Sequence, residues 1–141
     1  MNVQQIYNAQ FAYFSRPDAV LAKVPVNENG MSFGSSCRYR IRTTGAGCAV
    51  GCLIPPHLYH EDLEGVNCLA DRFMPVLEGI GVTGAQERTW LHVSQQLHDA
   101  LNTLTPRDFL LGLNGLALAQ YTHGDAVATT PVPPPEAWNP A

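Results

Sequence analysis

The sequence predicts a single α+β domain of about four helices, with a small antiparallel β-hairpin on one side and a proline-rich C-terminal tail. The length of 141 residues is typical of one domain. Apolar residues recur with helical spacing in several segments and with strand spacing in one. Five of the eleven prolines fall in the last eleven residues. We therefore expect residues 1–123 to form the domain and residues 124–141 to form an extended tail.

The N-terminal segment, residues 2–14, has the apolar spacing of an amphipathic helix. The residues on its apolar face are Val3, Ile6, Tyr7, Gln10, Phe11 and Phe14. Arg16-Pro17 interrupts this helix, because the residue before a proline is disfavoured in the helical region. Residues 25–36 follow as a loop, since they are rich in Pro, Gly, Asn and Ser.

A β-hairpin is predicted next, because residues 37–42 alternate between two faces. One face carries Cys37, Tyr39 and Ile41, and the other carries Arg38, Arg40 and Arg42. Residues 43–47 supply the turn. The apolar residues 48–54 either return as the second strand or start a short helix, because their pattern is ambiguous at this length. In the first alternative Cys37 lies opposite Cys48 on the inner face, and a disulfide between them is left open.

Prolines shape the middle of the chain. Pro55-Pro56 ends any regular element. Residues 57–65 then form a short polar segment with room for one helical turn. Residues 69–80 have helical periodicity again, and Pro75 must kink that helix or divide it in two.

The last two predicted helices are joined by almost no loop, so they form a tight pair. In the first, Thr83 and Gln86 match a capping box. Its apolar stripe consists of Trp90, Val93, Leu97, Leu101 and Leu104. The second begins at Thr105-Pro106, with a threonine cap and a proline in its first turn. Residues 109–119 are apolar nearly all round, so we expect this helix to be the central, buried one.

Composition and charge limit the class of function. Charged residues make up 14% of the chain, below the ~25% typical of soluble domains, while apolar residues make up 45%. We therefore expect part of the surface to be covered, by self-association into a homo-oligomer or by a partner. The net charge of −4 argues against bulk electrostatic binding of nucleic acid. No apolar run approaches ~20 residues and the first residues lack a signal-peptide pattern, so we expect no membrane span and no export.

Residues 37–65 contain several short motifs. They are Cys37-x-Tyr39-Arg40, Cys48-Ala49-Val50-Gly51-Cys52-Leu53-Ile54-Pro55, Tyr59 and Glu64-Gly65, and Leu97-His98-Asp99 follows later. Together they resemble a group of short bacteriophage and bacterial proteins with a C-x-Y-R, C-A-V-G-x-L-I, Y, E-G and H-D core, over about a third of the chain. The sequence departs from that pattern at Pro56, where an acidic residue is usual, and in the turn after Ile41. The resemblance implies a phage or bacterial origin and a location in the cytoplasm of the host bacterium, and it implies no particular activity.

The leading candidate site is the predicted stripe of Arg38, Arg40 and Arg42. Along a strand these guanidinium groups are ~6–7 Å apart. That spacing suits a phosphate-bearing ligand or an acidic partner. The alternative is a solvated strand face, neutralised by the acidic residues of segment 61–64.

A cysteine nucleophile is the enzyme alternative. Cys48 or Cys37, with His98 and Asp99, supplies the residue types of a thiol hydrolase. On one helix, however, the side chains of His98 and Asp99 point ~100° apart, so Asp99 cannot easily orient His98. The apolar run around Cys48 should also raise the pKa of its thiol.

Zinc is a further alternative. The candidate ligands Cys48, Cys52, His57 and Cys68 lie close together in the sequence, with His60 among them. Cys48 and Cys52 share a face in either a strand or a helix. No C-x2-C pair is present, so buried structural thiols are the competing interpretation.

The sequence therefore favours a non-enzymatic phage or bacterial accessory protein that binds a host protein or a phosphate-bearing ligand. The arginine stripe is the predicted ligand site, and Trp138 in the tail is the predicted anchor for a partner. A structural component of the virion is the close alternative. The cysteine hydrolase and the zinc-stabilised module are the others.

Overall fold

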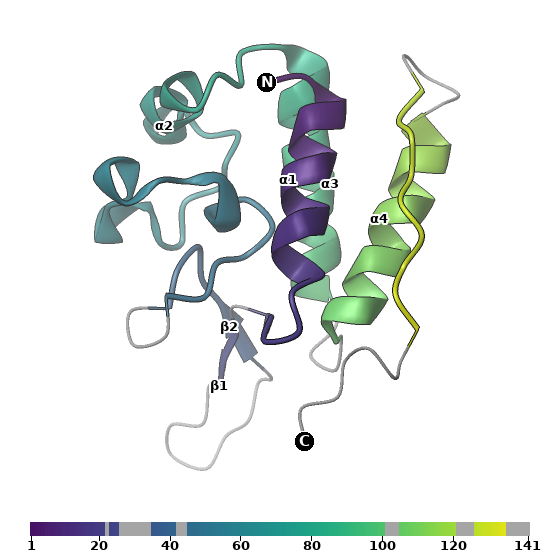
Figure 1. The fold of residues 1–141 in the computed structure, drawn as a ribbon. Coiled ribbons are helices and arrows are strands. Elements are labelled where there is room, and N and C mark those ends of the chain that lie inside the picture. Colours follow the sequence, from purple (N-terminus) through teal and green to yellow (C-terminus); the bar gives the residue numbers. More distant parts are fainter. Residues whose placement is uncertain (22, 26–34, 42–44, 101–104, 121–125, 135–141) are drawn as a thin grey trace.

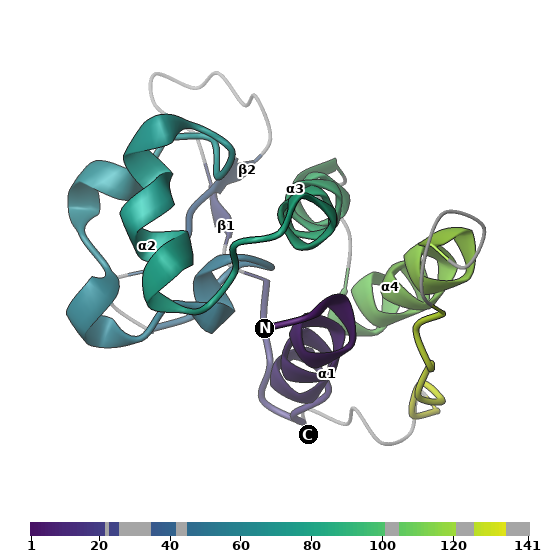
Figure 2. The ribbon, with the colours of Figure 1, turned by 90° about the horizontal axis from the view of Figure 1, so that it is seen from above.

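The computed structural model describes residues 1–21, 23–25, 35–41, 45–100, 105–120 and 126–134. Within these residues the α-helices are α1 (Val3–Phe14), α2 (Met74–Gly79), α3 (Ala85–Ala100) and α4 (Pro106–Gln120). Helices α1, α3 and α4 pack together, and the segment that contains α2 lies on the other side of α1 and α3 (Figures 1 and 2). None of the described helices is both long enough and apolar enough to cross a membrane.

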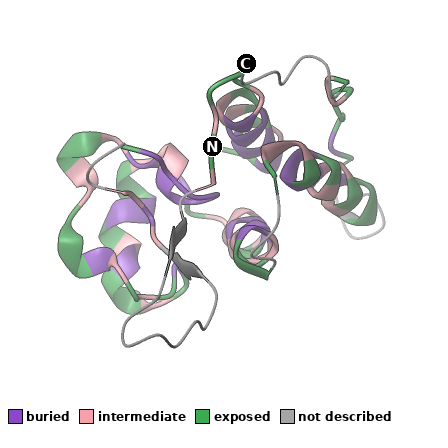
Figure 3. Cartoon of the chain, turned by 90° about the horizontal axis from the view of Figure 1, so that it is seen from below, coloured by how far each residue is buried: buried purple, intermediate pink, exposed green. Residues whose placement is uncertain are grey.

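The core lies where α1, α3 and α4 face one another and continues into the segment after the first strands. Buried positions occupy the inner sides of these helices and exposed positions the outer sides (Figure 3). The predicted N-terminal helix is confirmed as α1, and its buried residues are the six that the spacing indicates. Asn2 and Gln5 form a reciprocal capping box, with two hydrogen bonds of 2.8 Å, that fixes its start.

The predicted β-hairpin of residues 37–54 is wrong, and with it the α+β fold class, because the described part of the chain is built mainly of helices and its strand pair is a three-residue ribbon outside that hairpin. Among the described residues an isolated bridge pairs Arg40 of the first expected strand with Gly47, the last residue of the predicted turn. The chain then forms the 3-10 helix Gly51–Leu53. Of the two alternatives for residues 48–54, the short helix is therefore the one that the structure contains. Gly51 explains this path: a Cβ there would lie 1.8 Å from the carbonyl oxygen of Tyr39, so the two backbones pack closer than a ladder with side chains allows.

A short antiparallel ribbon precedes this region, in a segment that the sequence predicts as loop. It pairs β1 (Lys23–Pro25) with β2 (Ser35–Cys37). Cys37 is therefore the register partner of Lys23, not of Cys48.

Short 3-10 helices carry the chain from the core to α2. The polar segment predicted to make one turn makes two, Pro56–Leu58 and Glu61–Leu63. A further one, Asp71–Phe73, leads directly into α2. Pro75 lies in the first turn of α2, where a proline costs no hydrogen bond, so the expected division of this segment is confirmed.

Helix α3 buries a different face from the predicted one. Its buried residues are Trp90, Leu91, Ser94 and His98. Val93 and Leu97 are only half-buried, while Leu101 and Leu104 lie outside the described residues. The helix begins at Ala85, directly after Gly84. The apolar stripe thus indicates the helix correctly and misplaces its buried face by one position.

Helix α4 begins where the sequence predicts. Thr105 Oγ1 accepts from the backbone N of Asp108 at 3.2 Å, and the Asp108 carboxylate accepts from Thr105 N at 3.5 Å. The prediction of a central, buried helix is wrong, because α4 lies at the edge of the molecule (Figure 1). Leu111 and Leu118 are 45% and 69% exposed. Residues 126–134 run back along α4 as an extended segment (Figure 1).

Candidate functional site

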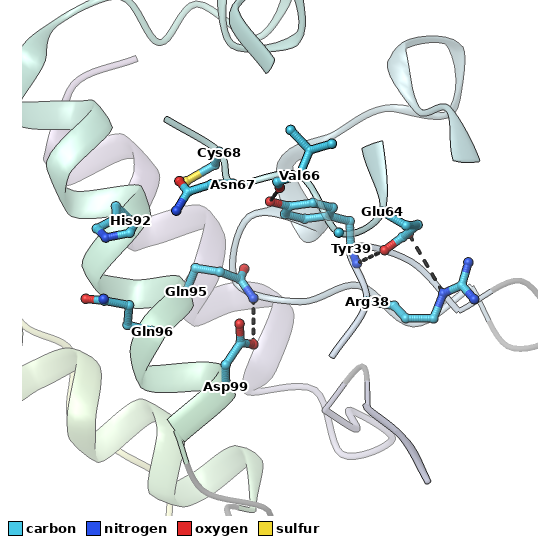
Figure 4. A pocket seen from close by; sticks show the side chains of 11 residues that line it. Arg38, Tyr39, Glu64, Val66, Asn67, Cys68, His92, Gln95, Gln96 and Asp99 are labelled. Atoms are coloured by element: carbon cyan, nitrogen blue, oxygen red, sulfur yellow. Dashed lines mark hydrogen bonds and ion pairs between the residues drawn. The ribbon is translucent and has the colours of Figure 1, made fainter. Parts of the chain in front are cut away.

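A polar hollow of about 340 Å³ opens beside α3. Helix α3 contributes Gln95, Gln96 and Asp99 to one wall, and the segments around residues 38 and 64 form the other (Figure 4). The opposite wall includes Arg38, Glu64 and Asn67. The hollow therefore combines two carboxylates, one guanidinium, three side-chain amides and the imidazole of His92.

Glu64 holds the wall opposite α3 together. Its carboxylate accepts hydrogen bonds from the backbone N of Tyr39 at 2.9 Å and of Arg40 at 3.2 Å. It also accepts from the Tyr59 hydroxyl at 2.6 Å and lies 3.9 Å from Nε of Arg38. Glu64 thus binds the N–H groups of Tyr39 and Arg40, while the carbonyl of Tyr39 still accepts from Cys48 N at 3.3 Å.

Tyr39 belongs to the same wall of the hollow. Its hydroxyl donates to the carbonyl of Val66, and its ring packs on Phe73 with centroids 4.9 Å apart. Burial raises the pKa of the Tyr39 hydroxyl above its ordinary value. Tyr39 is therefore a neutral, hydrogen-bonded part of the wall.

The α3 wall is ordered by contacts around Asp99. Gln95 accepts from the backbone N of Val50 at 3.0 Å and donates to Asp99 Oδ1 at 2.7 Å. His98 Nδ1 lies 2.9 Å from the same oxygen. The expectation that Asp99 cannot orient His98 is wrong, because Nδ1 is the ring nitrogen nearest the backbone and lies within reach of the next residue's carboxylate.

His98 faces the core rather than the hollow. Its ring is fully buried, with centroids 6.0 Å from Phe14 and 5.9 Å from Phe109. It is therefore a packing residue that also holds Asp99 at the end of α3.

The predicted arginine stripe is not brought together in the described residues. Arg38 donates to Glu61 at 3.0 Å, whereas Arg40 donates to the carbonyl of Ile54 at 2.5 Å and lies over the ring of Tyr59. Arg42 lies outside the described residues. Arg38 therefore pairs with carboxylates and Arg40 with a backbone carbonyl, while both interact with Tyr59.

Among the cysteines whose side chains the structure describes, Cys48, Cys52 and Cys68, none has the environment that a nucleophile needs. Cys48 is fully buried and its sulfur accepts from the backbone N of Gly51 at 3.2 Å. Burial raises the pKa of Cys48 well above its ordinary value, that of Cys52 to about 12 and that of Cys68 to about 11. Each of these thiols is therefore protonated at neutral pH. All three are free, so no disulfide joins Cys48 to Cys37.

The predicted zinc ligands are spread over different environments. Cys48 lies in the core, Cys68 beside the hollow, and His57 on an exposed 3-10 turn. Among the residues that the structure describes, no three His, Cys, Asp or Glu side chains are arranged to hold a metal ion. Trp138, the predicted partner anchor, lies outside these residues.

Motif residues from distant parts of the sequence converge on the hollow. Tyr39, Glu64-Gly65 and Asp99 all line it. The sequence analysis grouped these motifs as a resemblance without assigning them a common site, and it counted Glu64 among the charges that neutralise the arginine stripe. Comparison of the chain with protein-family models, curated proteins and solved structures finds no match.

Proposed function

We propose that the protein is a phage or bacterial accessory protein that acts by binding, and that a partner inserts a cationic group, such as a lysine or arginine side chain, into the hollow beside Asp99. The observation that carries this proposal is the charge of the wall. Glu64 and Asp99 both line the hollow, whereas the one guanidinium there, that of Arg38, pairs with Glu61 and lies 3.9 Å from Glu64. The carboxylates of the lining therefore outnumber its guanidinium by two to one.

The position of Asp99 strengthens the preference for a cation. Asp99 lies in the last turn of α3, where the unpaired carbonyl groups of a helix carry partial negative charge. Its side chain is 41% exposed, while its bonds to Gln95 and His98 hold the carboxylate in place. A preorganised carboxylate loses little conformational entropy on binding a cation.

The amide groups of the hollow support recognition of a polar group. Asn67 and Gln96 lie on opposite walls and can donate or accept hydrogen bonds at the mouth. A phosphate group finds less support here, because both carboxylates repel it and Arg38 already has partners. Binding of phosphate is therefore the alternative outcome of the test.

The test is an NMR titration of the full chain with agmatine, which carries an amine and a guanidinium group. We expect the side-chain NH₂ signals of Gln96 and Asn67 to shift. Asp99→Asn should weaken binding roughly tenfold, as the loss of a charge-assisted hydrogen bond implies. Asp62→Asn removes an equal charge from the exposed 3-10 turn next to the hollow and should leave the affinity unchanged.

A parallel titration with inorganic phosphate distinguishes the two ligand classes. If the same signals shift with phosphate and not with agmatine, the proposal of a cationic ligand is wrong, and a phosphate site at Arg38 is favoured. No shift with either probe would overturn the hollow as a ligand site.

A further inference from the structure

The C-terminal segment 126–134 is held by side chains that bind its main chain. Gln4 of α1 contacts Ala128 twice: its Oε1 accepts from Ala128 N at 2.7 Å, and its Nε2 donates to Ala128 O at 3.1 Å. One side-chain amide thus pairs with both main-chain groups of one residue, as a neighbouring strand would do.

Two residues further along, Thr130 is held in the same way by α1 and α4 together. The Tyr7 hydroxyl accepts from Thr130 N at 2.8 Å and donates to Asn114 Oδ1 at 2.5 Å. Asn114 Nδ2 donates to Thr130 O at 3.0 Å. Finally, Arg107 Nε donates to the carbonyl of Pro133 at 3.1 Å. We call Gln4, Tyr7, Arg107 and Asn114 the tail-binding residues.

The tail-binding residues bond to main-chain groups of the segment and not to its side chains. Residues 128–131 have exposed side chains, Val127 is buried, and Val132 is half-buried against the core. The pattern required of an occupant is therefore short: two free N–H groups two residues apart, an aliphatic residue just before them, and another aliphatic residue between prolines after them.

No single strong contact holds this segment in the described structure. It is bound by four hydrogen bonds between uncharged groups, by one from the Arg107 guanidinium, and by the packing of Val127 and Val132. Prolines lower the entropy lost when an extended peptide is ordered, which is why proline-rich segments serve as ligands of shallow surfaces. A competing peptide with the same pattern can match every one of these interactions.

We propose that the tail-binding residues form a binding site for extended, proline-rich peptide segments of a partner protein, and that residues 126–134 occupy this site as an internal ligand that the partner displaces. This site lies on α1 and α4 and shares no residue with the hollow beside Asp99. It therefore stands or fails independently of the proposed cation site.

The experiment uses the full chain and a fluorescent peptide with the sequence of residues 126–134. The double variant Ala128→Pro/Thr130→Pro removes the two N–H groups from the chain's own tail and leaves the tail-binding residues intact. We expect this variant to bind the peptide at least roughly tenfold more tightly than the unmodified chain, because the intramolecular competitor is weakened.

Tyr7→Phe in the same background should weaken peptide binding about fivefold, since the ring is retained and the bonding hydroxyl is lost. Tyr13→Phe is the matched control: it makes the same change on α1, but its hydroxyl accepts from Gly47 N, away from the tail. Equal peptide binding by the unmodified chain and the double variant, or equal effects of the two tyrosine changes, would overturn the proposal.

A measurement on the unmodified chain covers the case in which the double variant does not fold. Excess peptide should accelerate hydrogen exchange at the amides of Ala128 and Thr130, which lose their partners when the tail is displaced. Unchanged exchange at both amides under saturating peptide would also overturn the proposal.

Discussion

Trp90 Nε1 donates a hydrogen bond of 2.9 Å to Oε1 of Gln10 inside the core. The same amide donates through Nε2 to the carbonyl of Ala49 at 2.9 Å and to Ser94 Oγ at 3.0 Å. Gln10 is fully buried, so one side chain of α1 satisfies polar groups of α3 and of the segment before Gly51. Such a network fixes how α1 sits against both neighbours.

The first prediction is that Gln10→Leu destabilises the protein by about 2–4 kcal/mol, because it leaves the indole N–H of Trp90 and the Ala49 carbonyl buried without their partner. The measurement is urea unfolding followed by circular dichroism. Gln96→Leu, on the exposed side of α3, should change the free energy of unfolding by less than about 0.5 kcal/mol. Equal effects of the two changes would contradict the assigned role of Gln10.

Local signals were enough to predict one helix start and one buried face. The face of α1 follows from spacing alone, and Gln10 was included because it lies on the apolar face. The start of α4 follows from Thr105 and its cap. In α3 apolar spacing did not predict the buried face, because that face includes the polar residue Ser94. Ser94 can be buried because it accepts a hydrogen bond from Gln10, 84 residues earlier in the chain.

The hairpin and the site could not be predicted, since both depend on contacts between distant residues. The alternation of residues 37–42 is a genuine strand pattern. It is overruled by Glu64, which caps the backbone of Tyr39 and Arg40, and by Gly51, which lets two backbones meet. The hollow forms only because α3 then lies against this wall.

The second prediction concerns Glu64. Glu64→Ala should destabilise the protein by about 2–4 kcal/mol, because two backbone N–H groups and the Tyr59 hydroxyl lose their acceptor. Glu61→Ala is the control, since that side chain is 49% exposed and its pair with Arg38 contributes at most about 1 kcal/mol. Thermal unfolding of both variants decides between a structural carboxylate and an ordinary surface charge.

The third prediction compares two glycines. Gly51→Ala should cost about 3 kcal/mol or more, since the added Cβ would meet the backbone of Tyr39 and neither chain can move cheaply. Gly115→Ala in α4 should stabilise the protein by about 0.5–1 kcal/mol, because the space around it is open and alanine favours a helix. Chemical denaturation gives both values, and a tolerated alanine at residue 51 would refute the close packing of these backbones.

The last prediction is a loss of stability at alkaline pH caused in part by Cys68. Burial raises the pKa of this thiol from 9.0 to about 11 in the folded protein. The folded state therefore holds a proton that the unfolded chain releases near its ordinary pKa. This contribution is complete below pH 9 and is lost as the pH rises toward 11. Urea unfolding across this range should show a shallower decline for Cys68→Ala than for the unmodified chain. Cys48 and Cys52 titrate in both proteins, and Tyr39, whose pKa is raised by burial and by Cys68, changes the decline in the same direction. Parallel curves would mean that the Cys68 thiol ionises as readily in the folded protein as in the unfolded chain, and would reopen the question of a reactive cysteine beside the hollow.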